Sequence, residues 1–370
     1  MRAIVVSRVY ADPGTRGKLK ALAGLGVSVA AAVPDRWSPL GLGAEQQTVW
    51  GDDGGVRTVP ISVRGSTSSD ADPTWSRSAL RQLLTDFRPE LVQIEEEPWT
   101  RAASTAAALA RRLRVPYVIL TRESLPGGYG ALGRIRRSRV LGHAKGLLAV
   151  NELAAKLVTR QHPSLARQVI PQLGVGLPLQ GVRPEQTGLT IGFFGRLIPE
   201  KGLDLLFRAC VKLVGRWTIT VIGTGPAQEE LEGLAERLGI AGRVTWLGAL
   251  SRQQVDEIWP RLDCVVLPSR TAPRWVEGAP RAAMEAMAHG VAVVASAAGA
   301  LPEIVGAAGL VVPEEDVIAI AEALQRLHDD PVERARLAAA GRRRAMSEYT
   351  DAAIAGKTLR FWTESVAATS

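Results

Sequence analysis

Short apolar runs alternate with amphipathic stretches along the first part of the chain. Four runs rich in β-branched residues predict buried strands: RAIVVSRVY from residue 2, VSVAAAVP from 27, LVQIE from 91 and PYVILT from 116. Three stretches between them carry apolar residues at helical spacing: KLKALAGLG from residue 18, RSALRQLLTDF from 77 and TRAASTAAALARRLR from 100. Strands that alternate with helices form a parallel sheet with helices on both faces, so we expect an α/β domain here.

The same alternation resumes at residue 189. Five runs predict strands: LTIGFFG, WTITVIG, RVTWLG, CVVLPS and VAVVAS. Four stretches of helical spacing separate or follow them: DLLFRACVKLV, AQEELEGLAERLG, QVDEIWPRL and PRAAMEAMAHG. Beyond them, residues 317–349 predict two further helices, and a last helix is expected near 350–366.

Residues 171–188, PQLGVGLPLQGVRPEQTG, separate the two series. Their prolines, glycines and lack of periodicity indicate a linker. A chain of 370 residues is long enough for two cores. We therefore expect two Rossmann-like, doubly wound domains over residues 1–175 and 186–349, followed by a helical segment over 350–370. Ligands of open α/β sheets bind beyond the carboxyl ends of the strands, so two facing domains predict a ligand cleft between them.

The composition excludes several classes of protein. With 46% hydrophobic and 22% charged residues, the chain resembles folded globular proteins and not disordered ones. No apolar run is long enough to span a membrane, and the N-terminal run is too short for a signal peptide. The two cysteines, Cys210 and Cys264, cannot form a disulfide framework, which fits a reducing compartment. These features predict a cytoplasmic protein.

The positive charge is concentrated in the first half of the chain. Residues 1–185 contain 25 basic and 15 acidic residues, whereas residues 186–370 contain 20 and 22. In the segment GRIRRSRVLGHAK, a predicted helix carries Arg134, Arg136, Arg137 and Arg139. Such a helix fits an anionic membrane surface or a lipid-phosphate acceptor, but a solvated helix face explains it equally well. No aromatic residues are interleaved with these cations, so we do not expect nucleic acid as a partner.

A candidate anion site occurs in GFFGRLIPEKGLDLL, residues 192–206. A predicted strand ends at Gly195, Arg196 follows at once, and Lys201 stands just before a helix that begins near Leu203. Two cations at the carboxyl end of a strand, beside a helix N-terminus, could bind a diphosphate. A surface loop with solvated cations is the alternative.

The segment VIGTGP is weak evidence for a dinucleotide-binding turn. Gly223 and Gly225 lack the third glycine of a dinucleotide fingerprint, and a tight turn with close backbone approach explains them as well.

Two glutamates lie eight positions apart in WVEGAPRAAMEAMAHG. Because proline favours the first turn of a helix, Pro280 predicts a helix over about 280–289. Glu277 then lies in the loop before the helix, and Glu285 in its second turn. A loop carboxylate beside backbone N–H groups suits the hydroxyl groups of a sugar. A local ion pair for Glu285 and a solvated Glu277 form the alternative interpretation.

Taken in order, six segments resemble the donor-binding half of glycosyltransferase family 4: GRLIPEKG, VIGTGP, RVTWLGAL, LDCVVLPS, EGAPRAAMEAMAHGVAVVAS and GALPEIVG. These are retaining enzymes of the GT-B fold, and the pair formed by Glu277 and Glu285 matches the family's signature. The resemblance is close over roughly 189–345 and looser in the first half, where EEEPW is similar to bacterial members that act on cell-surface polysaccharides.

The resemblance implies roles for these residues. Arg196 and Lys201 would hold the donor diphosphate, and Glu277 the donor sugar; these three form the implied catalytic set. Glu285 would bind the ribose, and Leu250 lies where relatives contact the nucleobase. The implied donor-binding set is Gly14, Gly195, Leu250, Glu277, Gly278, Ala279, Pro280, Arg281 and Glu285. One departure is Ala300, where the family usually has a second glycine close to the sugar.

The first domain is implied to bind the acceptor, and the last helix to cross back onto it. In ADPGTRG, Gly14 stands in the place of the family's glycine-rich loop, and Arg16 is an added cation. Glu97 ends the run of three glutamates after a predicted strand, where one of them could position an acceptor hydroxyl; a solvated strand end is the alternative. Glu123 occupies the position of a histidine that many relatives place near the sugar.

These observations predict a retaining glycosyltransferase that moves a hexosyl unit from a UDP- or GDP-sugar to a hydroxyl group of a glycan, glycolipid or small molecule. No cofactor or metal is expected: the fixed cations stabilise the leaving phosphate, and the four histidines show no ligand spacing. No Asp-x-Asp metal signature stands where this chemistry would need one, and the pair Asp52 and Asp53 lies in a glycine-rich loop. The alternatives are a GT-B sugar-nucleotide epimerase and a non-catalytic binder of nucleotide sugars or polyanions.

Overall fold

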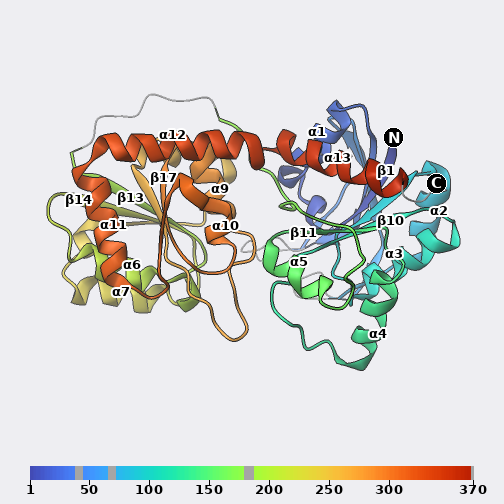
Figure 1. Cartoon of the computed structure of the whole chain (residues 1–370), viewed down its shortest axis with the longest axis horizontal. Helices are drawn as coiled ribbons and strands as arrows, with labels where there is room; N and C mark the ends of the chain where they lie inside the picture. Colours follow the sequence, from blue (N-terminus) through green and yellow to red (C-terminus); the bar gives the residue numbers. More distant parts are fainter. Residues whose placement is uncertain (38–44, 66–71, 179–186, 368–370) are drawn as a thin grey trace. The chain divides into compact units, whose positions relative to one another are not determined.

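The computed structural model describes residues 1–37, 45–65, 72–178 and 187–367. The chain divides into two compact units (Figure 1). The first contains Met1–Gly174 together with Asp351–Ser370, and the second contains Val175–Thr350. The expected linker, 171–188, includes this boundary, but its residues 179–186 lie outside the described residues.

The first unit is built on an eight-stranded sheet. Its strands are β1 (Arg2–Val6), β2 (Ser28–Pro34), β5 (Gly51–Asp53), β6 (Val56–Ile61), β9 (Leu91–Ile94), β10 (Tyr117–Thr121), β11 (Gly146–Ala149) and β12 (Arg167–Val169). Their order is β12-β11-β10-β9-β1-β2-β6-β5, and all neighbours are parallel except β5, which is antiparallel to β6. Two short antiparallel pairs are separate from this sheet: β3 (Arg36–Trp37) with β4 (Gln46–Gln47), and β7 (Val63–Arg64) with β8 (Thr74–Trp75).

Helices cover both faces of this sheet because successive strand residues point to opposite sides. The helices of this unit are α1 (Gly17–Gly24), α2 (Arg77–Phe87), α3 (Arg101–Arg112), α4 (Gly130–Leu141), α5 (Glu152–Thr159) and α13 (Asp351–Ala367). In β1, Ile4 and Val6 belong to the core with α2, α3 and α4, whereas Ala3 and Val5 belong to the core with α1 and α13.

Helix α13 is an integral part of the first unit although it lies far away in sequence. It packs against α1. The side chain of Trp362 is buried, and its Nε1 donates to Gln93 Oε1 of β9 at 2.6 Å.

The second unit contains a six-stranded parallel sheet. Its strands are β13 (Leu189–Phe194), β14 (Trp217–Ile222), β15 (Val244–Gly248), β16 (Cys264–Leu267), β17 (Ala292–Ser296) and β18 (Leu310–Val312). Their order is β15-β14-β13-β16-β17-β18. The helices are α6 (Leu203–Cys210), α7 (Gln228–Arg237), α8 (Arg252–Ile258), α9 (Arg281–Ala288), α10 (Leu301–Val305), α11 (Val317–Asp329) and α12 (Pro331–Glu348).

This sheet is also covered on both faces. In β13, Ile191 and Phe193 pack in the core with α6, α7 and α11, while Phe194 packs with α9 and α10. Strand β13 reverses the order of the sheet, because the chain passes from β15 back to its other side at β16. Ligands of such sheets bind at this switch point, beyond the carboxyl ends of the central strands.

The expected first strand is too long by several residues. Strand β1 ends at Val6, and Val9–Ala11 form a 3₁₀ turn. The carbonyl of Val9 accepts a hydrogen bond from Thr15 Oγ1 at 2.7 Å, and Tyr10 is buried. These contacts within the ADPGTRG turn replace further strand pairing.

Candidate functional site

The basic loop after β13 is held by backbone contacts. Lys201 ends a 3₁₀ turn, and Gly202 behind it adopts a left-handed conformation with φ of 68°. A Cβ atom on Gly202 would lie 2.0 Å from the carbonyl oxygen of Pro268, so only glycine fits there. Arg196 is exposed and forms no ion pair with the described residues. Among the described residues, Lys201 of this loop has an ion-pair partner and Arg196 has none.

Lys201 and Glu277 form an ion pair. The Nζ atom of Lys201 donates to Glu277 Oε2 at 2.6 Å, and Ser269 Oγ donates to the same oxygen at 3.0 Å. Glu277 is only 6% exposed. The Nζ atom also lies 5.4 Å from the centre of the Trp275 ring. The cost of burying this carboxylate is thus offset by a cation and a hydroxyl group.

The backbone of Glu277 is fixed by the GALPE segment. Its carbonyl oxygen accepts a hydrogen bond from the N–H of Ala300 at 2.8 Å. Gly299 has φ of 54°, and a Cβ atom there would come within 2.2 Å of that oxygen. The first glycine of this segment is therefore required by close approach. Ala300, the departure from the family pattern, is buried and contributes its N–H group.

Glu285 lies in the second turn of α9, as the position of Pro280 predicts. Its Oε1 accepts from Arg281 Nε at 2.7 Å and from Arg252 Nη1 at 3.2 Å. Its side chain is 17% exposed, and its other oxygen accepts no hydrogen bond from the described residues. Glu277 is therefore a loop carboxylate, and Glu285 a helix carboxylate with one oxygen available.

The VIGTGP turn packs directly on the basic loop. Gly223 has φ of 130°, and a Cβ atom on it would lie 1.9 Å from the carbonyl oxygen of Gly195. A Cβ atom on Gly225 would lie 2.4 Å from the carbonyl oxygen of Leu197. Close backbone approach explains these two glycines without a dinucleotide. Leu250, just beyond β15, is half-buried against the core that contains Phe194.

The ADPGTRG turn of the first unit contains Gly14 and Arg16. Arg16 is only 6% exposed, and its guanidinium donates to the carbonyl oxygens of Tyr10 at 2.8 Å and Ala11 at 3.1 Å. These carbonyls hold the guanidinium inside the turn, and its role on the acceptor side stays a prediction. The N–H of Gly14 donates to Asp12 Oδ1 at 2.8 Å.

The three glutamates after β9 each have a different partner. Glu95 is buried and pairs with the buried Lys18 at 2.7 Å. Glu96 pairs with Arg8 at 2.6 Å. Glu97 accepts from Thr121 Oγ1 at 2.7 Å and from the N–H of Arg122 at 2.9 Å. Glu97 is thereby bonded to the end of β10, beside the segment that contains Glu123.

Glu123 and Arg137 form a second buried pair. Their side chains are 7% and 4% exposed and approach to 3.7 Å. Burial, followed by the charge of Glu97, raises the pKa of Glu123 despite the nearby cation. The expectation that Arg137 faces a membrane together with its neighbours is wrong, because this guanidinium points inward. Among the other arginines predicted there, Arg134 and Arg139 are exposed and Arg136 is half-buried.

Several residues of these clusters escaped prediction from sequence. Ser269 follows the apolar run of β16, so its place at a strand's carboxyl end was a usable signal. Arg252 and Lys18 gave no such signal, because their partners lie 33 and 77 positions away.

Within the described ranges, no group of three or more His, Cys, Asp or Glu is placed to hold a metal ion. No helix there has the length and apolar composition needed to cross a membrane.

Two family models match the chain. "Glycosyl transferase 4-like domain" matches residues 12–172, and "Glycosyl transferases group 1" matches residues 180–344. A GDP-mannose-dependent alpha-(1-6)-phosphatidylinositol monomannoside mannosyltransferase from Mycolicibacterium smegmatis is 36% identical over 161 residues, 42% of each chain. The 2-deoxystreptamine glucosyltransferase of Streptomyces kanamyceticus is 25% identical over 70% of this chain and 73% of its own. The chain spans less than half the length of the first three curated relatives: 42%, 42% and 45%.

Solved structures are similar over nearly the whole chain. Sucrose-phosphate synthase from Thermosynechococcus elongatus has a TM-score of 0.73 and 19% identity, with 100% of both chains covered. Anabaena HepE in complex with UDP and glucose has a TM-score of 0.71 and 18% identity over 98% of this chain and 100% of its own. At these identities the likeness concerns the fold, and the predicted GT-B fold of two Rossmann-like domains is confirmed.

Proposed function

The chain belongs to the glycosyltransferases of the family-4 type, and on that premise we propose that it transfers a hexosyl unit from a nucleoside-diphosphate sugar to a hydroxyl group. The acceptor is a glycan, a glycolipid or a small molecule, and the donor is a UDP- or GDP-sugar. Relatives named as GDP-mannose-dependent mannosyltransferases support the second donor, and the structure of HepE with UDP and glucose supports the first.

One observation carries the proposal: Lys201, Glu277 and Ser269 meet at the carboxyl edge of the second sheet, with the unpaired Arg196 on the same loop as Lys201. In this proposal Lys201 and Arg196 bind the donor diphosphate. Negative charge grows on the leaving phosphate as its bond to the sugar breaks, and fixed cations stabilise that charge without rearranging. The buried Glu277 then accepts hydrogen bonds from the sugar hydroxyls, assisted by the backbone that follows it.

The other donor contacts follow from the same unit. The available oxygen of Glu285 accepts from the ribose hydroxyls, while Arg281 and Arg252 keep its partner oxygen in place. Leu250 provides apolar surface for the nucleobase.

We propose that transfer retains the configuration at the anomeric carbon and needs no metal ion. The bond between this carbon and the β-phosphate oxygen breaks, and the acceptor oxygen bonds to the same face of the carbon. The acceptor proton passes to the departing phosphate oxygen, so no protein nucleophile is required. Charge stabilisation by Arg196 and Lys201 takes the part that a divalent cation has in metal-dependent transferases.

The exposed face of α4 supports a further partner, an anionic membrane surface. Arg134 and Arg139 are exposed and Arg136 is half-buried, beside Leu132 at 69% and Ile135 at 46% exposure. Basic residues next to exposed apolar ones favour binding at an anionic lipid surface. Binding to phosphatidylglycerol vesicles that falls in an Arg134→Gln/Arg139→Gln variant is the expected result, and equal binding would contradict this assignment.

A thermal-shift screen with UDP-, GDP- and dTDP-sugars tests the donor. A ligand at about 100 times its Kd adds about 2.7 kcal/mol of stability, which raises the melting temperature by roughly 5–10 °C. Turnover is then measured with that donor, with and without EDTA, and the anomeric configuration of the product is read by NMR. Glu277→Gln and Lys201→Met should each abolish transfer, while Arg208→Gln, an exposed change on α6, should not.

The outcomes separate the alternatives. Full turnover in either site variant would contradict the assignment of these residues. A wild type that binds one donor but neither hydrolyses nor transfers its sugar would be a nucleotide-sugar binder. Conversion of the donor into its epimer would identify a sugar-nucleotide epimerase. Loss of activity with EDTA, or inversion at the anomeric carbon, would refute the proposed mechanism.

A further inference from the structure

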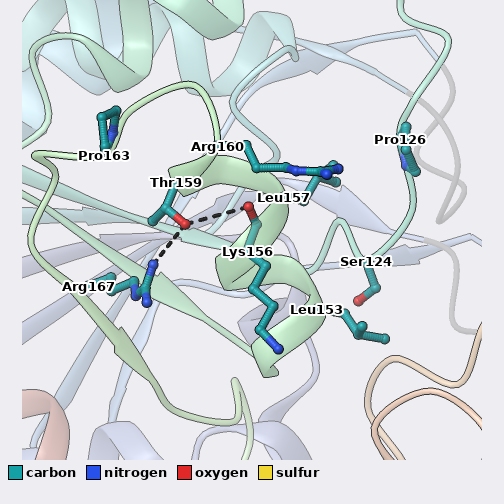
Figure 2. A pocket seen from close by; sticks show the side chains of 9 residues that line it. All are labelled: Ser124, Pro126, Leu153, Lys156, Leu157, Thr159, Arg160, Pro163 and Arg167. Atoms are coloured by element: carbon teal, nitrogen blue, oxygen red, sulfur yellow. Dashed lines mark hydrogen bonds between the residues drawn. The ribbon is translucent and has the colours of Figure 1, made fainter.

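A groove of about 590 Å³ lies along α5 in the first unit (Figure 2). Its walls come from α5 itself, from the loop after β10 and from the segment that leads into β12. The groove has no part in the site described above, and all of its lining residues belong to the first unit.

Three cations line the groove, and no carboxylate is found among its described lining residues. Arg167 reaches from β12 and donates to Thr159 Oγ1 at 2.8 Å, as Figure 2 shows. Lys156 and Arg160 are exposed, one turn apart on α5, and neither forms an ion pair within the described residues. Like charges at this spacing repel each other, so a bound dianion would relieve an existing cost.

The helix end alone does not explain these charges. A helix C-terminus stabilises a nearby cation, which accounts for Lys156 and Arg160 near the end of α5. It does not account for Arg167, which comes from another segment and lines the same hollow. Cations that converge from separate elements are what a phosphate group requires.

The rest of the groove is apolar. Leu153 and Leu157 lie one turn apart on α5 and both line it, and Leu153 is 39% exposed. Two prolines complete the wall. Apolar surface next to unpaired cations matches a ligand that carries a phosphate group and an apolar portion.

One end of the groove is tied to the segment predicted to contact the acceptor. Ser124, which lines the groove, follows Glu123 directly in the loop after β10. Asn151 Nδ2 donates to Ser124 Oγ at 2.9 Å, and Asn151 Oδ1 accepts from the N–H of Ala154 in α5 at 2.7 Å. A single buried side chain thus joins the loop to the start of the helix. Two acids are adjacent in sequence to residues that line the groove: Glu123 is already paired with Arg137, and Glu152 is the exposed first residue of α5.

We propose that this groove binds a phosphate-bearing amphiphile, with the phosphate on Lys156, Arg160 and Arg167 and the apolar portion along Leu153 and Leu157. The identification of this ligand as the acceptor of the reaction rests on the proposed function, whereas the binding itself does not. The acceptor is therefore a phosphate ester with an apolar group, either a membrane lipid or a water-soluble ester.

Isothermal titration of the full chain with hexyl phosphate tests the binding. Inorganic phosphate and hexyl glucoside serve as probes of the two halves of the ligand, and each should bind more weakly than hexyl phosphate. The variant Lys156→Gln/Arg160→Gln should raise the Kd for hexyl phosphate by about 10- to 100-fold, since two charge-assisted hydrogen bonds are lost. The control Arg208→Gln/Lys212→Gln removes two exposed cations from the second unit and should leave the Kd unchanged.

Equal Kd values for hexyl phosphate in the two double variants would overturn the proposal, as would hexyl glucoside binding as tightly as hexyl phosphate. Vesicles with and without phosphatidic acid distinguish the sources: loss of phosphatidic-acid binding in the groove variant indicates a lipid, and unchanged vesicle binding with lost hexyl phosphate binding indicates a soluble ester.

Donor hydrolysis without acceptor separates this proposal from the proposed function. The groove variant should hydrolyse its donor at the wild-type rate but transfer poorly to a phosphate-bearing acceptor, with a raised KM. A wild type that hydrolyses no donor contradicts the proposed function and leaves the titration result standing. A groove variant that transfers normally to such an acceptor contradicts the identification of the ligand as the acceptor.

Discussion

The pairing of Lys201 with Glu277 can be measured as a free energy. Lys201→Met keeps the length of the side chain but removes the cation, and it leaves a carboxylate that is 8% exposed with Ser269 as its remaining partner. Breaking a fully buried ion pair from one side costs about 3–5 kcal/mol. Because the Lys201 side chain is 21% exposed, water already screens part of the pair, and we expect a loss of about 2–3 kcal/mol.

Removing the carboxylate instead of the cation should lower the stability less. Glu277→Gln leaves a lysine whose flexible end can turn toward water, so a loss of about 1 kcal/mol is expected. The double variant Lys201→Met/Glu277→Gln should be more stable than Lys201→Met alone, since no unpaired charge remains buried. The coupling free energy from this cycle should be about 1.5–2.5 kcal/mol.

Scanning calorimetry of the full chain measures these values. A loss of about 2 kcal/mol lowers the melting temperature of a unit of this size by roughly 4–8 °C. Peptide-resolved hydrogen exchange assigns the shifted transition to the second unit. A coupling free energy below about 0.5 kcal/mol, or a double variant no more stable than Lys201→Met, would refute the reasoning, because the buried carboxylate would then be stabilised by something other than Lys201.

Three further predictions concern other buried groups. Arg137→Met should cost about 2–3 kcal/mol because it leaves Glu123 buried without its cation, whereas Arg134→Met on the exposed face should change stability by less than about 0.5 kcal/mol; urea denaturation checks both. The pKa of Glu123 is raised above 4.5, so its contribution to stability is present at low pH and is lost as the pH rises through the raised value. The stability of Glu123→Gln relative to the wild type should therefore increase between pH 4.5 and neutrality. A difference in melting temperature that stays constant over this range would contradict the prediction. Gly239→Ala places its Cβ in open space and should lower stability by about 1 kcal/mol because of the left-handed backbone. Gly202→Ala should lower stability by roughly 1–3 kcal/mol more, because its Cβ clashes with Pro268. Equal melting temperatures of the two variants would show that the basic loop can shift to relieve the clash.

The sequence predicts the fold well where the strands are long and buried. The alternation around LTIGFFG and WTITVIG predicts β13 and β14 because both faces of these strands are covered, which leaves apolar runs bounded by glycines. The pattern misses β11, α5 and β12, which have only four, eight and three residues. Length alone does not explain this, since β9 also has four residues and is predicted. Strands β11 and β12 are specified by pairing with their neighbours in the sheet more than by their own pattern.

The candidate site is predicted less evenly. Glycines forced by close approach, such as Gly299, lie in segments that the family resemblance already singles out, so their positions could be foreseen. The burial of three cations could not be predicted. Arg16, Lys18 and Arg137 look like solvated surface residues in sequence, yet all three are buried. For Lys18 and Arg137, a carboxylate supplied by the tertiary fold decides the burial, and local sequence does not encode that partner. Arg16 is instead held by carbonyl oxygens of its own turn, whose conformation the pattern does not predict.

The hydrogen bond between Trp362 and Gln93 has a consequence for how the protein is made. The first unit needs α13 to cover one face of its sheet, but residues 175–350 are synthesised before that helix. At 5–20 residues per second, ribosomes take roughly 10–35 s over this interval. During that time α1 covers only part of this face of the nascent sheet, and the apolar residues that pack against α13, with the site of the Trp362 indole, stay exposed. The second unit should therefore complete its fold before the first. During this interval, chaperones that bind nascent chains have access to the first unit, the half of the protein that was translated first.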